Sequence, residues 1–355
     1  MPPCANRHKR HHKPACRGRF VSVRARGVST PATVNNEGVA EQHAAKVSIV
    51  GVGSVGTAIA YACLIRGSAQ ALALYDMNAK KVRAEVLDLN HGSQFVPNCV
   101  VTGSDSIDVT AGSAIVVVTA GAKQKPGQSR LELAATNVAM AQTLTPALLE
   151  QSPDAVIIFV TNPVDLVTYA GARSVDVAPG RVFGSGTVLD SSRFRYLIGR
   201  RANVAVGNVH GFIVGEHGDS EIPLWSSVSI GGVPAAEWRS GGTLVFDEAT
   251  RASIAEGVVN AAYEIIEGKG ATNLAIGLST ARIIEAVLGD QNRVLPISSV
   301  QNGVYELTDV ALSLPTLVSR AGAGEVLQVP LAVKELLGLQ GSANTLRQAR
   351  DSLGL

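Results

Sequence analysis

Over its first half, the chain alternates short apolar runs with longer alanine- and leucine-containing segments. The runs have the length of buried strands, and the longer segments have the pattern of helices that pack on one face. Strands that alternate with helices in this way form a parallel sheet covered on both faces. We therefore predict a doubly wound parallel sheet, with strands at 46–50, 71–76, 114–119 and 155–160 and helices at 57–66, 80–89 and 137–150.

After about residue 186 the pattern changes. A helix opens at Leu189, and longer helical segments follow, together with a stretch that alternates like strands. This mixture predicts a second domain of α+β type over residues 187–355, after a first domain over residues 45–186. The expected strands cover 225–233 and 295–310, and the expected later helices cover 247–267, 274–289 and 331–352.

A glycine fingerprint follows the first predicted strand directly. Gly51, Gly53 and Gly56 form a GxGxxG motif before a helix, and Asp76 ends the second strand 20 residues beyond Gly56. In this context the motif predicts a Rossmann dinucleotide site: the glycines allow a tight turn, close approach of a pyrophosphate and helix packing. Asp76 can accept hydrogen bonds from ribose hydroxyls and repels a 2′-phosphate, which favours NAD over NADP.

Other polar groups lie where ligands bind in such sheets, at the carboxyl ends of strands. These are Asn162 and the turn Thr119-Ala120-Gly121. The segment 121–130 is polar and contains glycine and proline, which is the composition of a lid that ends at Arg130. The alternative for this segment is a solvated surface loop.

An unusual histidine lies in the second half, in Gly215-Glu216-His217-Gly218. The glycines allow backbone or ligand to come close to the imidazole, which can hold or release a proton near neutral pH. Asp190 and Arg193 lie three residues apart on a predicted helix. Separately, His217 could be a plain loop residue, and the other two could be an ordinary helical ion pair.

Together, these groups suit the reduction of a 2-keto acid. Arg193 can hold a carboxylate with a bidentate fork, and His217 can act as the general acid. Asp190 can orient the imidazole and stabilise its charged form, while Arg130 can stabilise developing negative charge on the carbonyl oxygen. A nicotinamide would supply the hydride.

The N-terminal segment, residues 1–40, has a composition unlike the rest. It contains eight Lys or Arg residues and no acid before Glu37, which is typical of an organelle transit peptide. Its proline, alanine, serine and arginine content favours a plastid over a mitochondrion; without a transit function the protein would be cytoplasmic. The alternative is a basic tail that binds nucleic acid. Without residues 1–36, Lys and Arg fall from 31 to 23 against 29 acids, so the remainder carries about −6 and we expect no nucleic-acid partner.

Composition excludes several other classes. A membrane-spanning helix needs about 20 consecutive apolar residues, and no apolar run in the sequence is that long. We therefore expect no membrane partner. The four cysteines form no CxxC motif and no cluster with histidine, so we expect free thiols and no metal.

From about Ala45 to Leu353 the chain resembles L-lactate dehydrogenases of the lactate/malate dehydrogenase family. The resemblance is carried, in the family's order, by VSIVGVGSVGTAIA, GAKQKPGQSRLEL, VTNPVD, GTVLDSSRFRYLI, GEHGDS, KGATNLAIG and VLPISSVQNGVYELTDVALSLPTLVSRAG. It implies NAD-dependent interconversion of pyruvate and L-lactate, a place in glycolysis and fermentation, and a homotetramer.

The resemblance also implies roles for single residues. The catalytic group would be His217, Asp190, Arg193 and Arg130, and the substrate contacts would be Gln124, Arg130, Asn162, Arg193 and Thr272. The NAD site would include Gly51, Val52, Gly53, Val55, Gly56, Asp76, Thr119, Ala120, Gly121, Asn137, Asn162 and Ile276. One departure from the family is Leu274, which stands where a tryptophan is often found.

Gln124 separates two possible substrates. Malate dehydrogenases are similar here but carry an arginine that pairs with the second carboxylate. A neutral Gln124 would leave that anion unpaired in a closing site, so we expect pyruvate rather than oxaloacetate. The alternatives that stay open are malate or another 2-hydroxy acid as substrate, and a dinucleotide-binding protein that has lost catalysis.

Two further residues point to regulation. Arg195 and His210 match positions that in bacterial relatives bind fructose 1,6-bisphosphate across a two-fold subunit axis. Two copies of each would form a cradle for a bisphosphate activator. The alternative is a purely structural role for both residues.

Overall fold

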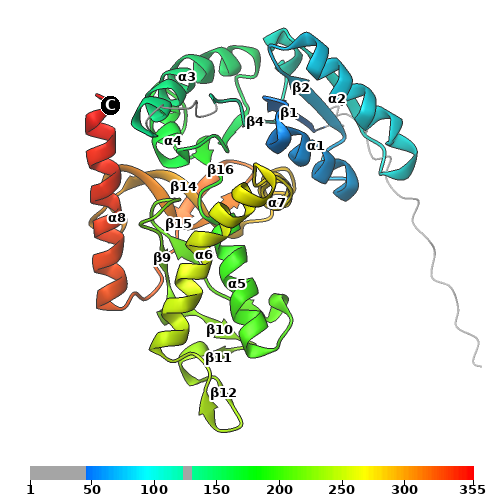
Figure 1. Cartoon of the computed structure of the whole chain (residues 1–355). Helices are drawn as coiled ribbons and strands as arrows, with labels where there is room; N and C mark the ends of the chain where they lie inside the picture. Colours follow the sequence, from blue (N-terminus) through cyan, green and yellow to red (C-terminus); the bar gives the residue numbers. More distant parts are fainter. Residues whose placement is uncertain (1–44, 123–129) are drawn as a thin grey trace, which may run out of the picture. The chain divides into compact units, whose positions relative to one another are not determined.

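The computed structural model describes residues 45–122 and 130–355 (Figure 1). The predicted lid residue Gln124 and the N-terminal segment lie outside the described residues. The helices are α1 (Ser54–Arg66), α2 (Ala79–His91), α3 (Arg130–Gln151), α4 (Val164–Arg173), α5 (Val188–Ala202), α6 (Glu248–Lys269), α7 (Leu274–Leu288) and α8 (Val333–Ser352).

The strands fall into one large sheet and several short ribbons. The large sheet contains β1 (Lys46–Val50), β2 (Ala71–Tyr75), β3 (Val100–Ser104), β4 (Ile115–Val118), β5 (Val156–Phe159), β6 (Val182–Gly184), β14 (Arg293–Asn302), β15 (Thr308–Ser319) and β16 (Gly322–Val326). The ribbons contain β7 (Val209–His210), β8 (Ile213–Val214), β9 (Ile222–Pro223), β10 (Ser229–Ile230), β11 (Val233–Pro234), β12 (Arg239–Ser240) and β13 (Thr243–Leu244).

The predicted parallel sheet is confirmed. Strands β3, β2, β1, β4, β5 and β6 lie in that order and are parallel throughout. Every residue of β4 and β5 is buried, as expected for strands covered by helices on both faces. The order reverses at β1, so the crevice where such sheets bind ligands lies above β1 and β4.

The C-terminal half extends this sheet, which the sequence did not predict. Strand β14 pairs antiparallel with β6 at Ser298 and Gly184, and β15 and β16 follow. The expected alternation over 295–310 is a hairpin that reverses at about residue 303. The domain boundary near residue 186 stays a prediction, because the two parts share one sheet.

Helix α3 begins at Arg130, where the lid was expected to lead into a helix, and continues without a break through the predicted helix at 137–150 to Gln151. Helix α4 was not predicted from the sequence; eight of its ten residues are buried. Among the described residues, no helix combines the length and the apolar character needed to cross a membrane.

The turn after β1 needs a glycine at residue 56, because there is no room for a side chain there. A methyl group on Gly56 would lie 2.0 Å from the Gly51 carbonyl oxygen, whereas one on Gly53 would meet no heavy atom within 4 Å. We expect Gly56→Ala to lower the free energy of unfolding by about 2 kcal/mol or more. The matched variant Gly53→Ala should stay within about 0.5 kcal/mol. Urea denaturation checks both values, and equal midpoints would contradict the packing argument.

Candidate active site

The turn at the carboxyl end of β1 exposes unpaired backbone donors. Helix α1 begins directly after Gly53, with no side-chain cap and no acidic residue in its first turn. The N–H groups of that turn therefore face the crevice and favour an anion. Gly51 has φ +91°, and a methyl group there would lie 2.6 Å from the backbone nitrogen of Ala120, so the turn packs tightly against the end of β4.

Asp76 lies beside this turn, at the end of β2. Its Oδ2 accepts a hydrogen bond from Val52 N–H at 2.9 Å, and its Oδ1 accepts one from Asn78 N–H at 3.0 Å. The structure thus joins Asp76 to the glycine turn, as the spacing predicted. Val52 contributes its backbone there, because its side chain is buried.

Amide and hydroxyl groups join the end of β4 to the glycine turn and to the end of β5. Thr119 Oγ1 donates to Gly51 O at 2.6 Å. Asn137 is buried; it accepts from Ala122 N–H and donates to Asn162 O, both at 2.8 Å. Asn137 therefore holds the start of the predicted lid against the end of β5. Its direct contact with a cofactor stays a prediction, whereas the side chain of Asn162 is exposed to the crevice edge.

His217, Asp190 and Arg193 come together as predicted. The His217 Nδ1 lies 2.6 Å from Asp190 Oδ2, and Arg193 Nη1 donates to Asp190 Oδ1 at 2.7 Å. The Asp190 side chain is 2% exposed, while that of His217 is 27% exposed. A buried carboxylate thus carries two cationic partners, and the imidazole keeps an open side.

The surrounding charges favour the protonated imidazole. Burial disfavours the charge of His217, but the charge and hydrogen bond of Asp190 outweigh it and raise the pKa of the imidazole to about 9. Asp165 and Glu221 add smaller contributions in the same direction. Burial also opposes the charge of Asp190, but His217 and Arg193 hold the pKa of that carboxyl below its usual range. At neutral pH the group is therefore an imidazolium, a carboxylate and a guanidinium.

The backbone of the histidine loop is attached to three separate elements. Gly215 exchanges two 2.9 Å hydrogen bonds with Ser313 of β15, and Glu216 N–H donates to Ser342 Oγ of α8 at 2.8 Å. His217 N–H donates to Asp165 Oδ2 of α4 at 2.7 Å. Helix α4 starts just after Asn162, so this bond brings the loop to the carboxyl end of β5.

Asp165 also holds the histidine loop, although no role was assigned to it from the sequence. It is buried and also accepts a 2.5 Å hydrogen bond from Ser298 Oγ of β14. Burial raises the pKa of its carboxyl to about 6, against the effect of the Ser298 hydroxyl and the His217 N–H. Its position in the motif VTNPVD was the available signal, but its partners lie 52 and 133 residues away.

The structure gives fewer contacts for the remaining residues of the predicted site. Thr272 lies between α6 and α7, and its Oγ1 is buried without a hydrogen-bond partner among the described residues. Ile276 and Val55 are partly buried, on α7 and α1. Arg130 is the first residue of α3, and its side chain lies outside the described part.

Arg195 and His210 lie on a different surface. Arg195 Nε donates to Gly211 O at 2.8 Å, and its guanidinium lies 5.2 Å from the ring centre of Phe212. His210 is exposed on β7, next in sequence to Gly211. Arg195 is thus bonded to the residue that follows His210, and no direct contact between the two side chains is seen among the described residues.

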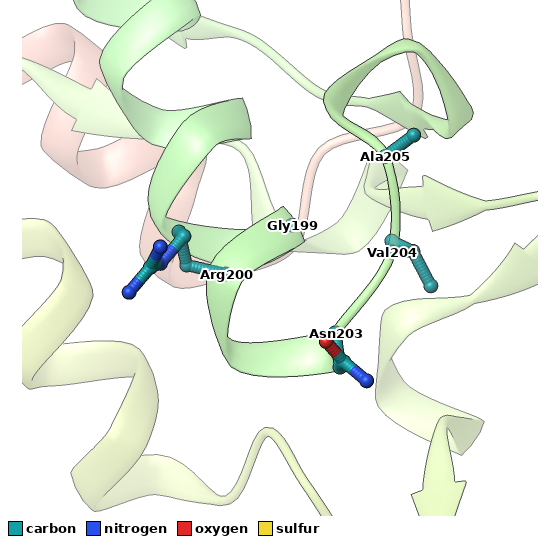
Figure 2. Close-up of a pocket in the computed structure, with 5 residues that line it drawn as sticks. All are labelled: Gly199, Arg200, Asn203, Val204 and Ala205. Carbon is teal, nitrogen blue, oxygen red and sulfur yellow. The ribbon is translucent and has the colours of Figure 1, made fainter.

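Two cavities lie away from the histidine. One of about 470 Å³ is at the C-terminal end of α5, opposite the end that carries Asp190, and is lined by Gly199, Arg200, Asn203, Val204 and Ala205 (Figure 2). The other, of about 760 Å³, borders β14 to β16. Neither is lined by His217, Asp190 or Arg193.

The fold and this site define a dinucleotide-binding dehydrogenase. The residues present fit NAD: the uncapped start of α1 suits a pyrophosphate, the space beside Gly53 admits it, and the Asp76 carboxylate suits ribose hydroxyls.

Comparison with known proteins shows to which family of dehydrogenases the chain belongs. The lactate/malate dehydrogenase NAD-binding domain matches residues 45–184, and the alpha/beta C-terminal domain of the same family matches residues 187–353. The chain belongs to the lactate/malate dehydrogenase family. NAD is the cofactor of the matched N-terminal domain.

Individual relatives agree with this assignment. The chain is 46% identical to an L-lactate dehydrogenase of Bifidobacterium animalis subsp. lactis over 87% of this chain and 97% of that protein. It is 46% identical to one from a Synechococcus strain, over 87% and 99%. The crystal structure of the minor L-lactate dehydrogenase of Enterococcus mundtii is 37% identical, with a TM-score of 0.84 over 87% of this chain and 98% of that one.

Because His217 depends on the Asp190 carboxylate, removing that carboxylate should change the pKa of the imidazole. We expect Asp190→Asn to lower the pKa of the imidazole by about one unit or more, because the neutral amide removes its largest favourable partner. The rate of ethoxycarbonylation at different pH values reports this pKa, since only neutral imidazole reacts, and His217→Asn supplies the background. Asp154→Asn, at an exposed acid elsewhere, is the control. An unchanged midpoint in Asp190→Asn would refute the assigned coupling.

Proposed function

We propose that the chain is an NAD-dependent L-lactate dehydrogenase that interconverts pyruvate and L-lactate. The observation that carries the proposal is the buried Asp190 carboxylate, which holds a proton-carrying imidazole and a guanidinium together. This pairing supplies a proton donor and a carboxylate-binding group in one place, which a 2-keto acid needs. The printed names of the relatives support the same substrate.

The hydrogen bonding of His217 assigns its proton-transfer atom. Nδ1 is engaged by Asp190, so Nε2 is the nitrogen that gives a proton to the keto oxygen, or takes one from the hydroxyl of lactate. When bound, the nicotinamide accepts or supplies the hydride. Asp190 acts as a positioning residue: it aims the ring and stabilises its charged form.

Arg193 binds the substrate carboxylate in this proposal. One of its donors is held by Asp190, which leaves the rest of the planar fork for a bidentate contact. The hydroxyl of Thr272, buried without a described partner, and the amide of Asn162 complete the polar contacts. Arg130 would stabilise the charge that develops on the keto oxygen, from the start of α3.

Gln124 provides the test of substrate choice. With the protein starting at Glu41, we expect NADH oxidation to be much faster with pyruvate than with oxaloacetate. Gln124→Arg should shift the ratio of kcat/KM by about tenfold or more toward oxaloacetate, because the added cation pairs with the second carboxylate. Gln128→Arg, which adds the same charge in the same loop, is the control.

Three outcomes would count against these proposals. A wild-type preference for oxaloacetate would favour malate as the natural substrate. Faster turnover of a bulkier keto acid would favour another 2-hydroxy acid. No turnover with any of them would support a protein that only binds the dinucleotide.

We propose that fructose 1,6-bisphosphate binds at Arg195 and His210. Burial lowers the pKa of the Arg195 guanidinium, and no carboxylate of the described residues pairs with it. A partly buried cation of this kind is stabilised by an anion, and the exposed His210 comes directly before Gly211, whose carbonyl oxygen accepts from Arg195.

A homotetramer is supported by exposed apolar side chains. Tyr61 and Ile65 on α1 are 56% and 53% exposed, and Leu274 and Leu278 on α7 are 65% and 55% exposed. Both pairs have the i, i+4 spacing that places them on one face of a helix. The two helices pack closely, since a methyl group on Gly277 would lie 2.7 Å from Ala58 O. A second copy of the chain would cover this surface.

The bisphosphate proposal predicts activation at low enzyme concentration and mildly acidic to neutral pH. We expect the bisphosphate to lower the KM for pyruvate by about fivefold or more. Arg195→Gln should abolish this effect, whereas Arg200→Gln, an exposed arginine on the same helix, should keep it. Sedimentation velocity reports the oligomer in the same samples. Saturation by pyruvate that is unaffected by the bisphosphate would disprove the proposal.

We also propose that residues 1–40 direct the protein to an organelle, with a plastid favoured. The basic composition without acids supports this assignment. N-terminal sequencing of the protein from its source would find a start near residues 37 to 45. An intact N-terminus would contradict it.

A further inference from the structure

Glu221 lies beside the proton-transfer group, although the steps above do not use it. It follows His217 by four residues and leads into β9. One carboxylate oxygen of Glu221, one ring nitrogen of His217 and one carboxylate oxygen of Asp190 all lie within 4.8 Å of one another. Its Oε1 is buried, and no described residue forms a hydrogen bond with that atom. A carboxyl in this position acts on the charges next to it.

The groups around Glu221 have opposite signs. Asp190 and Arg193 face it from α5, and His217 and the exposed Asp219 face it from its own loop. Asp165 of α4 acts on His217 from the backbone side. Two anionic neighbours and two cationic ones therefore decide whether the carboxyl is ionised.

Burial and the charge of Asp190 dominate this balance. They raise the pKa of the Glu221 carboxyl to about 8, against the effects of His217 and Arg193. Glu221 is in turn one of the groups that raise the pKa of His217 to about 9. The two titrations overlap and are coupled, so each proton lost from Glu221 makes the proton on His217 harder to remove.

We propose that Glu221 is a positioning residue for the proton on His217: when Glu221 is ionised, its charge keeps the imidazole protonated at alkaline pH. At lower pH, the Glu221 carboxyl is neutral and adds no second anion beside Asp190. At alkaline pH, the new negative charge lies in a poorly solvated site and stabilises the imidazolium there. The proposal rests on the proposed function, because only keto-acid reduction needs the protonated ring.

The test compares Glu221→Gln with the wild-type protein. Glutamine keeps the shape of the side chain but cannot ionise. We expect the alkaline midpoint of kcat/KM for pyruvate to fall by about 0.5 to 1 pH unit, with a change of less than about threefold on the plateau near pH 6. Glu221→Asp, which can ionise, should bring the midpoint back toward the wild-type value.

A matched control lies in the same loop. Asp219 is exposed and accepts a hydrogen bond from the Tyr263 hydroxyl at 2.9 Å. Because solvent screens its charge, Asp219→Asn should move the midpoint by less than about 0.2 pH unit. An equal shift in Asp219→Asn would mean that loop charge in general, and not Glu221, sets the midpoint, and would overturn the inference.

A second readout separates this inference from the proposed function. The pH dependence of ethoxycarbonylation of His217 follows the same proton without turnover, and should show the same downward shift in Glu221→Gln. A plateau that falls while both midpoints stay unchanged would show a merely structural role and overturn the inference. A shifted modification midpoint in a protein that turns over no 2-keto acid would support the coupling and overturn the proposed function.

Discussion

The site depends on one buried carboxylate, that of Asp190. Two cations meet on its two oxygens, and taking either away would leave one carboxylate oxygen without its partner in a place where only 2% of the Asp190 side chain is exposed. The arrangement explains why a residue near the start of α5 governs both the orientation of the imidazole and the position of Arg193. In the proposed mechanism, proton transfer and carboxylate binding are therefore coupled through a side chain that need not contact the substrate.

The histidine itself lies on a loop whose position depends on the whole second half of the molecule. Three backbone contacts, to Ser313, Ser342 and Asp165, come from β15, α8 and α4. Helix α4 follows the end of β5, so the last of these contacts also joins the loop to the dinucleotide-binding half. A continuous sheet through β6 and β14 supports that connection. The geometry of the site is thus a property of the combined fold.

Local patterns predicted what depends on local geometry. The spacing of Gly51, Gly53, Gly56 and Asp76 identified the cofactor turn, because strand, turn and helix are consecutive in the chain. The helical pair Asp190 and Arg193 was evident for the same reason, while its meeting with His217 was expected from the chemistry and from family resemblance. Asp165 and Glu221 received no role, because burial and contacts with distant segments give them their properties. Helix α4 was not predicted because it has only ten residues and follows Asn162-Pro163 directly, which leaves few turns over which a helical period can be recognised.

The bond from Glu216 N–H to Ser342 has a consequence for the order in which the protein matures. The two residues are 126 positions apart, so the histidine loop gains this contact only when α8 has packed against it. The dinucleotide turn is built from β1, α1 and β2, which are consecutive in the chain. The cofactor turn can therefore take shape before the histidine loop is held in place.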